Sequence, residues 1–166
     1  MAQLLVAQLR FARSEFQRGL AGVSAEDGIK RSLPMNCISW TVGHLAAQEQ
    51  RLWIEIPGRL APFPGLADRV GYGRPASTPP LAQMWDAWRQ ITAAADGFLD
   101  ELTAERLLEF PLWRGQRNDE TYGTLLYRNV YHYWFHLGNA YAMREQLGHV
   151  DLPQFVGDMS TAVYVP

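Results

Sequence analysis

The stretch RNVYHYWFHLG, residues 128–138, carries two histidines four positions apart in a strongly apolar segment. On an α-helix, four residues turn the chain through about 400° and advance it by about 6 Å, so both imidazoles leave the helix on one face. A helical two-histidine metal site requires this spacing. Aromatic neighbours make two charged imidazoliums costly, whereas neutral imidazoles bound to a metal ion avoid that cost. The pattern predicts His132 and His136 as metal ligands; the alternative is a pair at the edge of a bundle, hydrogen-bonded to water or carbonyls.

Helical periodicity extends over most of the chain. Apolar residues recur with the spacing of amphipathic helices, and Ser24-Ala-Glu-Asp27 has the form of a capping box that opens a short helical turn closed by Gly28. Proline and glycine mark the breaks between segments. The predicted long helices are residues 3–20; residues 37–56 with Asn36 as the N-cap; residues 78–102 with Thr78 as the cap and Pro79 and Pro80 in the first turn; and a helix from Asp119 or Glu120 to Leu147, stopped by Gly148.

The connections between these helices differ in length. Residues 57–80 contain six prolines and four glycines, which predicts a long ordered loop or lid without a helix or strand. Residues 103–119 are compatible with one more helical turn at 103–106 and with an extended segment at 107–113. Residues 149–166 form a tail that we expect to pack back on the helices. Together these features predict an all-α protein, a four-helix bundle over a single domain, residues 1–166.

Composition limits the classes of function. The chain is 48% hydrophobic and 19% charged with a net charge of −2, which indicates a globular protein and offers no basic surface for nucleic acid. No apolar run approaches the roughly 20 residues of a membrane span, and the N-terminus lacks the features of a signal peptide. We therefore expect a cytoplasmic protein that binds neither membrane nor nucleic acid. The single cysteine, Cys37, excludes an internal disulfide and a cysteine-based zinc site.

A third histidine falls in another predicted helix. His44 lies between Gly43, which leaves room for close approach, and Leu45. A lone histidine in such a place is usually a satisfied core residue, but three of the four histidines of the chain in helix interiors favour a shared metal site. The zinc-protease motif H-E-x-x-H is absent, because Tyr133 stands where it needs glutamate, and this argues against a metzincin-type peptidase.

The sequence resembles the DinB-like (DinB/YfiT-like) superfamily of metal-binding four-helix bundles. The residues that carry the resemblance are SWTVGHLA at 39–46, the His132 to His136 spacing within residues 128–138, and QLGHVDLP at 146–153. The resemblance spans nearly the whole chain. It implies one histidine on the second long helix and two on the last, here His44, His132 and His136, around a zinc, nickel or similar divalent ion. It also implies a homodimer.

Three histidine ligands leave at least one coordination position for water or substrate, as in catalytic sites. All-nitrogen ligation suits zinc, nickel, copper or iron; we expect zinc or nickel first. The resemblance implies transfer of a low-molecular-weight thiol to a small-molecule electrophile, with metal-assisted hydrolysis second. Gln48 and Asn129 are candidates for supporting the ligands, as is Asn139. No general base stands out, since Glu49 is expected to point elsewhere.

The sequence is also compatible with other functions. The protein could be a non-catalytic stress or binding protein with a structural metal site, or a metal-free helical module that docks a partner through residues 57–80 and its aromatic helices. Cys37 could be a nucleophile or simply a packed residue. His149 follows Gly148 and is expected to cap the last helix as a cation rather than bind metal.

Overall fold

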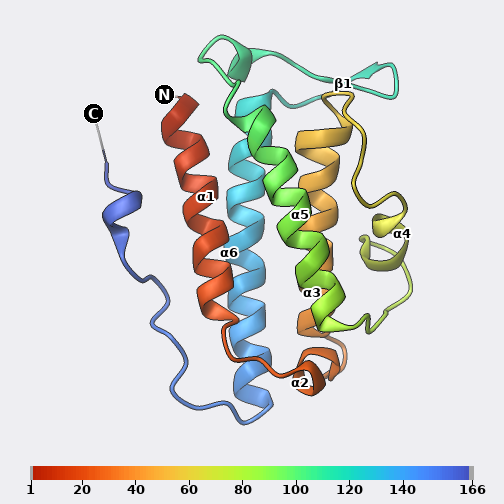
Figure 1. Ribbon diagram of the computed structural model, residues 1–166, viewed down its shortest axis with the longest axis vertical. Coiled ribbons are helices and arrows are strands. Elements are labelled where there is room, and N and C mark those ends of the chain that lie inside the picture. Colours follow the sequence, from red (N-terminus) through yellow and green to blue (C-terminus); the bar gives the residue numbers. More distant parts are fainter. Residues whose placement is uncertain (1, 165–166) are drawn as a thin grey trace.

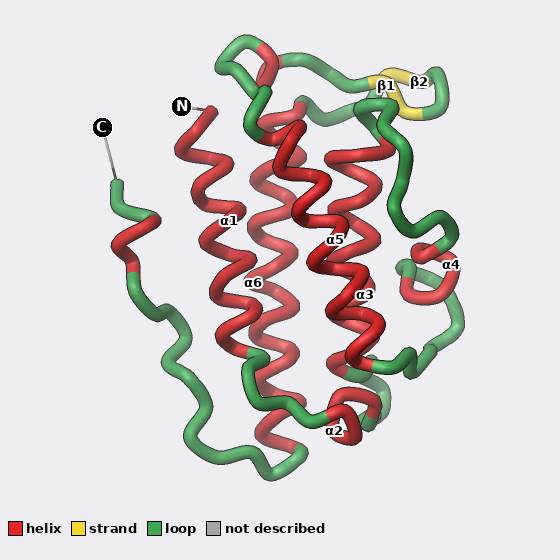
Figure 2. Tube along the Cα trace, in the orientation of Figure 1, coloured by secondary structure: helices red, strands yellow, loops and turns green. Residues whose placement is uncertain are grey.

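The computed structural model describes residues 2–164 and is mostly helical. Its four long helices, α1, α3, α5 and α6, lie side by side, and a two-stranded hairpin and short helices connect them (Figures 1 and 2). None of the helices among the described residues combines the length and hydropathy that a membrane crossing requires. The helices are α1 (Ala2–Gly19), α2 (Ala25–Ile29), α3 (Ile38–Gln50), α4 (Leu66–Val70), α5 (Leu81–Leu99) and α6 (Tyr122–Gln146); the strands are β1 (Leu112–Trp113) and β2 (Gln116–Arg117).

The long helices bury one continuous apolar core. Helix α1 packs against α6, α3 packs against α5, and α3 also faces α6 across the middle of the molecule (Figure 1). Each long helix contributes large side chains that are almost completely buried, along one face of α1, α5 and α6 and on nearly all sides of α3. Among the largest of these are Phe16, Ile38, Leu45, Trp53, Ile91, Phe98 and Leu126. This core fixes the facing surfaces of α3 and α6.

The predicted helix at 37–56 is present, but both of its ends differ from the prediction. Cys37 rather than Asn36 is the N-cap: its backbone is extended, and its Sγ accepts a hydrogen bond from the amide of Trp40 at 3.4 Å. Asn36 lies one residue too early for its side chain to reach that amide. After Gln50 the chain continues as a π-helical segment, η1 (Arg51–Glu55), rather than as α-helix.

The loop 57–80 contains a helix that the sequence analysis missed. The prediction that this segment has no helix or strand was wrong. Helix α4 forms there because Leu66 and Val70, one turn apart, are buried where α4 packs on α3. Gly65 precedes α4 with a positive φ of 79°, a conformation that glycine adopts without steric cost. The five-residue helix was hidden by the surrounding prolines and glycines.

Helix α5 begins at Leu81 with Pro80 as its N-cap, so Thr78 is not the cap and the two prolines precede the helix. The reason is that a residue before proline is pushed towards extended backbone, which keeps Thr78 and Pro79 out of the first turn. The helix ends at Leu99 rather than Leu102. Both alternatives for residues 103–119 are present in part, as a 3₁₀ turn, η2 (Arg106–Leu108), and the β1–β2 hairpin.

Helix α6 begins later than predicted and ends where predicted. Its N-cap is Thr121, whose Oγ1 accepts from the amide of Thr124 at 3.2 Å, so neither Asp119 nor Glu120 starts the helix. A hydroxyl that reaches the third amide outweighs a general preference for acidic residues near a helix start. Gly148, with φ of 84°, follows the end of the helix as expected.

The tail packs back on the helices over its described part, as predicted; residues 165–166 lie outside the described residues. The amide of Gly157 donates to Glu15 Oε2 at 2.9 Å, and the ring of Phe155 lies 6.2 Å from that of Trp134. The short 3₁₀ helix η3 (Met159–Thr161) lies beside α1 at the end of the tail (Figure 1). The tail covers the side of the molecule away from the three histidines.

Candidate metal centre

His44 projects from α3 toward α6 and is held in place from two sides. Its ring stacks on the indole of Trp40, one turn earlier, with ring centroids 4.5 Å apart and an interplanar angle of 11°. Its Nδ1–H donates to the backbone carbonyl of Val70 at 2.8 Å. That carbonyl comes from α4, which can approach α3 because Gly43 has no side chain: a Cβ there would lie 3.2 Å from Val70 Cγ1. The 57–80 segment thus orients His44.

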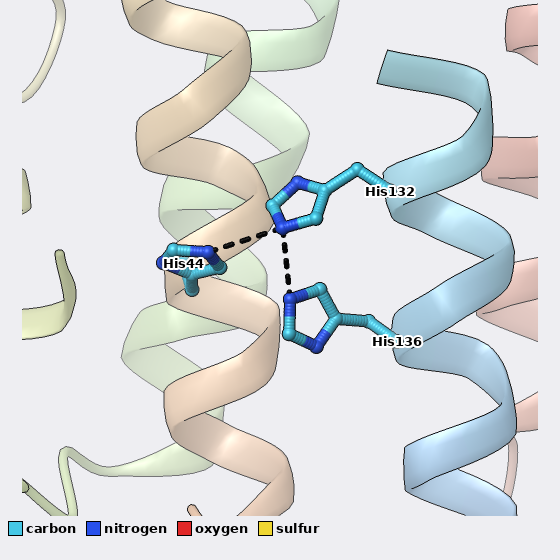
Figure 3. A group of neighbouring side chains, drawn as sticks. All are labelled: His44, His132 and His136. Carbon is cyan, nitrogen blue, oxygen red and sulfur yellow. Dashed lines mark hydrogen bonds between the residues drawn. The ribbon is translucent and has the colours of Figure 1, made fainter. Parts of the chain in front are cut away.

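His132 and His136 leave α6 on one face and meet His44 (Figure 3). The Nε2 atoms of His44 and His132 are 3.2 Å apart, and those of His132 and His136 are 2.9 Å apart. Ligand atoms of all three histidines lie within 4.8 Å of one another. A tetrahedral ion with bonds of about 2.0–2.1 Å to histidine nitrogens needs nitrogens a little over 3 Å apart. The predicted residues are therefore brought together in a position to hold a metal ion.

The protonation of these rings tests whether a cation fits. In neutral His44 and His132 the single ring proton is on Nδ1, since this nitrogen donates to Val70 and to Gln48 respectively. Their Nε2 atoms are consequently bare acceptors that face each other and His136. Lone pairs directed at one point repel each other, and a cation at that point turns the repulsion into coordination. The arrangement fits a metal ion better than it fits packing alone.

Gln48 and Asn129 support His132 through a chain of hydrogen bonds. The Nδ1–H of His132 donates to Gln48 Oε1 at 2.5 Å, and the same oxygen accepts from Asn129 Nδ2 at 3.0 Å. Trp53 Nε1 donates to Asn129 Oδ1 at 2.7 Å, and Asn129 is fully buried. This chain fixes the side-chain amides and with them the ring of His132. Asn139, the other candidate, is exposed and makes no hydrogen bond to the histidines among the described residues.

Burial keeps the three imidazoles neutral. It lowers the pKa of His136 to about 3, with further lowering by His132 and His44, and the pKa of His132 to about 4, with further lowering by His44 and by the positive charges of Arg51 and Arg128. The pKa of His44 is also lowered by burial, with a smaller contribution from the positive charge of Arg51. Neutral imidazole is the form that binds metal, so none of the three rings has to lose its cationic proton at neutral pH before it binds an ion.

The site opens on a cavity of about 920 Å³. His44, Gln48 and His132 line it, together with residues of α4, of the β1–β2 hairpin and of the first half of α6. His136 lies on the other side, next to a separate cavity of about 120 Å³. The metal position is therefore enclosed by protein on one side and accessible to a small molecule on the other, as a catalytic metal site requires.

Several other predicted roles can be compared with the structure. Glu49 points away from the site, as expected, and pairs with Arg13. Cys37 is fully buried, and burial raises the pKa of its thiol, which agrees with a packed residue rather than a nucleophile. His149 was expected to cap α6, but its ring contacts other side chains: its Nδ1 accepts from Arg144 Nε at 3.1 Å, and its Nε2 lies 3.2 Å from Asp27 Oδ2, which ties the end of α6 to α2.

Some supporting groups were not predicted. The carbonyl of Val70 has no signature in the sequence, because any residue supplies a backbone carbonyl. Trp53 lies five residues beyond Gln48, and its role could be inferred only if the position of the facing helix α6 were already known. Arg51, which lines the cavity, was not singled out either.

Fold and site together define a helical protein with three histidines positioned to hold a metal ion in a cleft between two helices. A model of the DinB superfamily matches residues 8–140, which is most of the chain and includes all three histidines. The chain therefore belongs to the DinB superfamily. A search of curated proteins gives no match.

Proposed function

We propose that this protein is a four-helix bundle of the DinB/YfiT-like type that acts as a divalent-metal-dependent enzyme. His44, His132 and His136 hold the ion, with zinc or nickel preferred over iron or copper. The observation that carries the proposal is the convergence of the Nε2 atoms of these residues at the edge of the 920 Å³ cavity. Membership of the DinB superfamily agrees with it.

The leading reaction is transfer of a low-molecular-weight thiol, RSH, to a small-molecule electrophile, R′X, which gives the thioether RSR′ and HX. When bound, a divalent ion would supply Lewis acidity that lowers the pKa of a thiol or polarises the electrophile. The chain itself contributes orientation: Gln48 and Val70 hold two rings, and the cavity accommodates the reactants. No carboxylate among the described residues hydrogen-bonds to the three histidines, and the carboxylates that line the cavity are those of Glu55 and Glu120. Hydrolysis of a small substrate is the second reaction that this site supports.

Metal analysis of the purified protein tests the proposal directly. After growth in medium supplemented with zinc and nickel, we expect close to one equivalent of metal per chain. His132→Ala and His44→Ala should each lose it while retaining the helical circular dichroism spectrum. The loaded protein should turn over an electrophile such as 1-chloro-2,4-dinitrobenzene with a thiol donor. Absence of metal from the wild-type protein would reject the proposal.

A structural metal site is the alternative, and one observation favours it: the three ligands connect α3 with α6 and so could clamp the two helices (Figure 3). In a non-catalytic stress or binding protein, metal removal would lower the melting temperature strongly and no thiol or ester substrate would react. An enzyme would lose activity on metal removal and regain it when the ion is restored.

We also propose that the protein is a cytoplasmic homodimer. Support for the dimer comes from the superfamily resemblance. Light scattering at micromolar concentration should give about twice the mass of the chain. A monomer mass would contradict the dimer without affecting the metal proposal.

A further inference from the structure

The 920 Å³ cavity beside the histidines, called the cleft below, has an excess of positive charge. Its lining contains twice as many guanidinium groups as carboxylates. A divalent ion held by three neutral histidines would increase this excess further, since none of the three ligands carries a compensating charge. The charged residues of the lining are Arg51, Arg74, Arg114 and Arg128, and Glu55 and Glu120.

The arginines differ in whether they already have partners. Arg128 pairs with Glu120 through both nitrogens of its fork, with 2.7 Å between Nε and Oε2. Arg74 Nη2 lies 2.6 Å from Asp68 Oδ1. Within the described part of the chain, neither Arg51 nor Arg114 has a carboxylate within ion-pair distance. The guanidinium of Arg51, which faces the cleft, is therefore free to bind an anion.

Arg51 stands on the same helix face as the histidine of α3. His44, Gln48, Arg51 and Glu55 follow one another at helical spacing and all line the cavity. Seven residues of helix place the Arg51 backbone about 10 Å along the axis from that of His44. Hydrogen bonds pair residue 48 with 132 and residue 53 with 129, so α3 and α6 run in opposite directions. Arg51 thus lies beyond the histidines along this helix, beside the first half of α6.

The β1–β2 hairpin adds the second free guanidinium. Arg114 and Gly115 form its two-residue turn with φ of 52° and 80°, the left-handed geometry of a type I′ turn. Asparagine or glycine would adopt φ of 52° more easily than arginine does. Arg114 stacks over Trp113, 5.1 Å from the ring centroid, and both residues line the cavity. The hairpin therefore adds a cation and an aromatic ring to the lining of the same cavity.

The α6 side of the cleft is aromatic. Tyr127, Tyr131 and Phe135 recur every fourth residue on α6, are exposed, and line the cavity beside His132. The rings of Tyr127 and Tyr131 stack 6.1 Å apart. Exposed rings in a cleft offer apolar contact area to a ligand. A molecule with both an apolar part and an anionic group would make favourable contacts with this wall and with Arg51 together.

We propose that the substrate bound by this cleft is a small organic acid with an aromatic or other apolar portion, whose oxyanion is bound by Arg51. The planar guanidinium donates two parallel N–H···O bonds to a carboxylate. Tyr131 and Phe135 contact the apolar portion, and the rest of the molecule extends toward His44 and His132. This inference rests on the proposed function, because it assigns the substrate class of the same site.

Binding of phenylacetate to the metal-free protein tests the inference without activity. Phenylacetamide is the neutral probe of nearly the same shape, and metal-free protein excludes direct binding of the carboxylate to an ion. By saturation-transfer NMR titration, wild type should bind phenylacetate at least about tenfold more tightly than phenylacetamide, as expected for a charge-assisted pair. Arg51→Gln should remove that preference, and Arg51→Lys should retain part of it.

Arg89→Gln is the matched control, because Arg89 is an exposed arginine on α5 outside this cavity, and it should bind phenylacetate as wild type does. Equal binding of acid and amide by wild type, or an unchanged preference in Arg51→Gln, would overturn the inference. Wild type could instead bind thioglycolate but not phenylacetate, with the binding lost in Arg51→Gln. That result would also overturn the inference, since Arg51 would then bind the anionic group of the thiol and not that of the electrophile. Metal content, measured separately, should be unchanged in Arg51→Gln, so failure of the metal proposal is recognised independently.

Discussion

At the scale of single residues, Gln48 determines which nitrogen of His132 is available to a metal ion. Its Oε1 accepts the Nδ1 proton of His132 and leaves Nε2 bare. Gln48→Leu keeps the size of the side chain but removes the acceptor, so we expect metal affinity to fall by about 10–100-fold with all three ligands intact. Competition with a fluorescent chelator measures this change.

Gln90→Leu provides the control for that variant, because Gln90 is an exposed glutamine on α5 that bonds only to Asp86 among the described residues. Its metal affinity should equal that of wild type. Equal affinities in Gln48→Leu and wild type would show that the hydrogen bond does not orient the ligand.

The histidine pKa values predict how the metal-free protein responds to acid. Their folded-state pKa values, about 4 for His132 and about 3 for His136, lie below the value of about 6.5 expected in an unfolded chain. The unfolded chain therefore binds more protons below pH 6.5, and stability is present above that pH and is lost as pH falls toward 3. Between pH 7 and pH 4.5 we expect a loss of roughly 2–3 kcal/mol from each of these two groups.

Urea unfolding of the metal-free protein at the two pH values measures this loss. The variant in which all three histidines are replaced by alanine serves as the reference, since it has lost the groups responsible and should show a smaller change in the free energy of unfolding. The same pH dependence in both proteins would assign the effect to other residues.

At the scale of the elements, the close approach of α4 to α3 at Gly43 positions the carbonyl that orients His44. A Cβ at Gly43 would lie 2.4 Å from Met84 Sδ and 3.2–3.3 Å from both methyl groups of Val70. Gly43→Ala should therefore push α4 and α5 outward, cost about 1–3 kcal/mol of stability and weaken metal binding through the Val70 to His44 hydrogen bond.

Gly138→Ala in α6 is the matched control for Gly43→Ala. A Cβ at Gly138 meets nothing within 4 Å, so this substitution should stabilise the protein by about 0.5–1 kcal/mol through helix propensity alone. Thermal unfolding of the two variants should shift in opposite directions. A stabilising shift in both variants would show that the neighbours of Gly43 accommodate the added methyl group without cost.

The elements also show how far the sequence can predict this protein. The long helices and the meeting of His44 with His132 and His136 followed from periodicity and family-like motifs, because helix spacing fixes which residues share a face. Helix α4 and the cap at Cys37 did not follow, since they depend on packing against α3 and on backbone geometry. Gln48 and Asn129 were candidates by position, but only the facing helices show that one oxygen joins them to His132.

On the scale of the whole molecule, a buried polar network connects all four long helices beneath the site. Arg13 of α1 bonds to Glu49 of α3 and, at 2.8 Å, to Asp96 of α5, while Tyr133 of α6 donates to Glu49 at 2.7 Å. Glu49 is fully buried and Arg13 is 5% exposed. Tyr133 adjoins His132 in sequence, so the network also fixes the part of α6 that carries the ligands.

Glu49→Ala should destabilise the protein by about 3–5 kcal/mol, because it leaves the Arg13 guanidinium buried without its main partner. Glu101→Ala, which removes the exposed pair with Arg59, should cost only about 0–1 kcal/mol. The double variant Arg13→Met with Glu49→Leu should recover most of the loss, since it removes both buried charges together. Denaturant unfolding of the three variants measures these differences; a double variant as unstable as Glu49→Ala would mean that the network, and not the unpaired charge, holds the four helices in register.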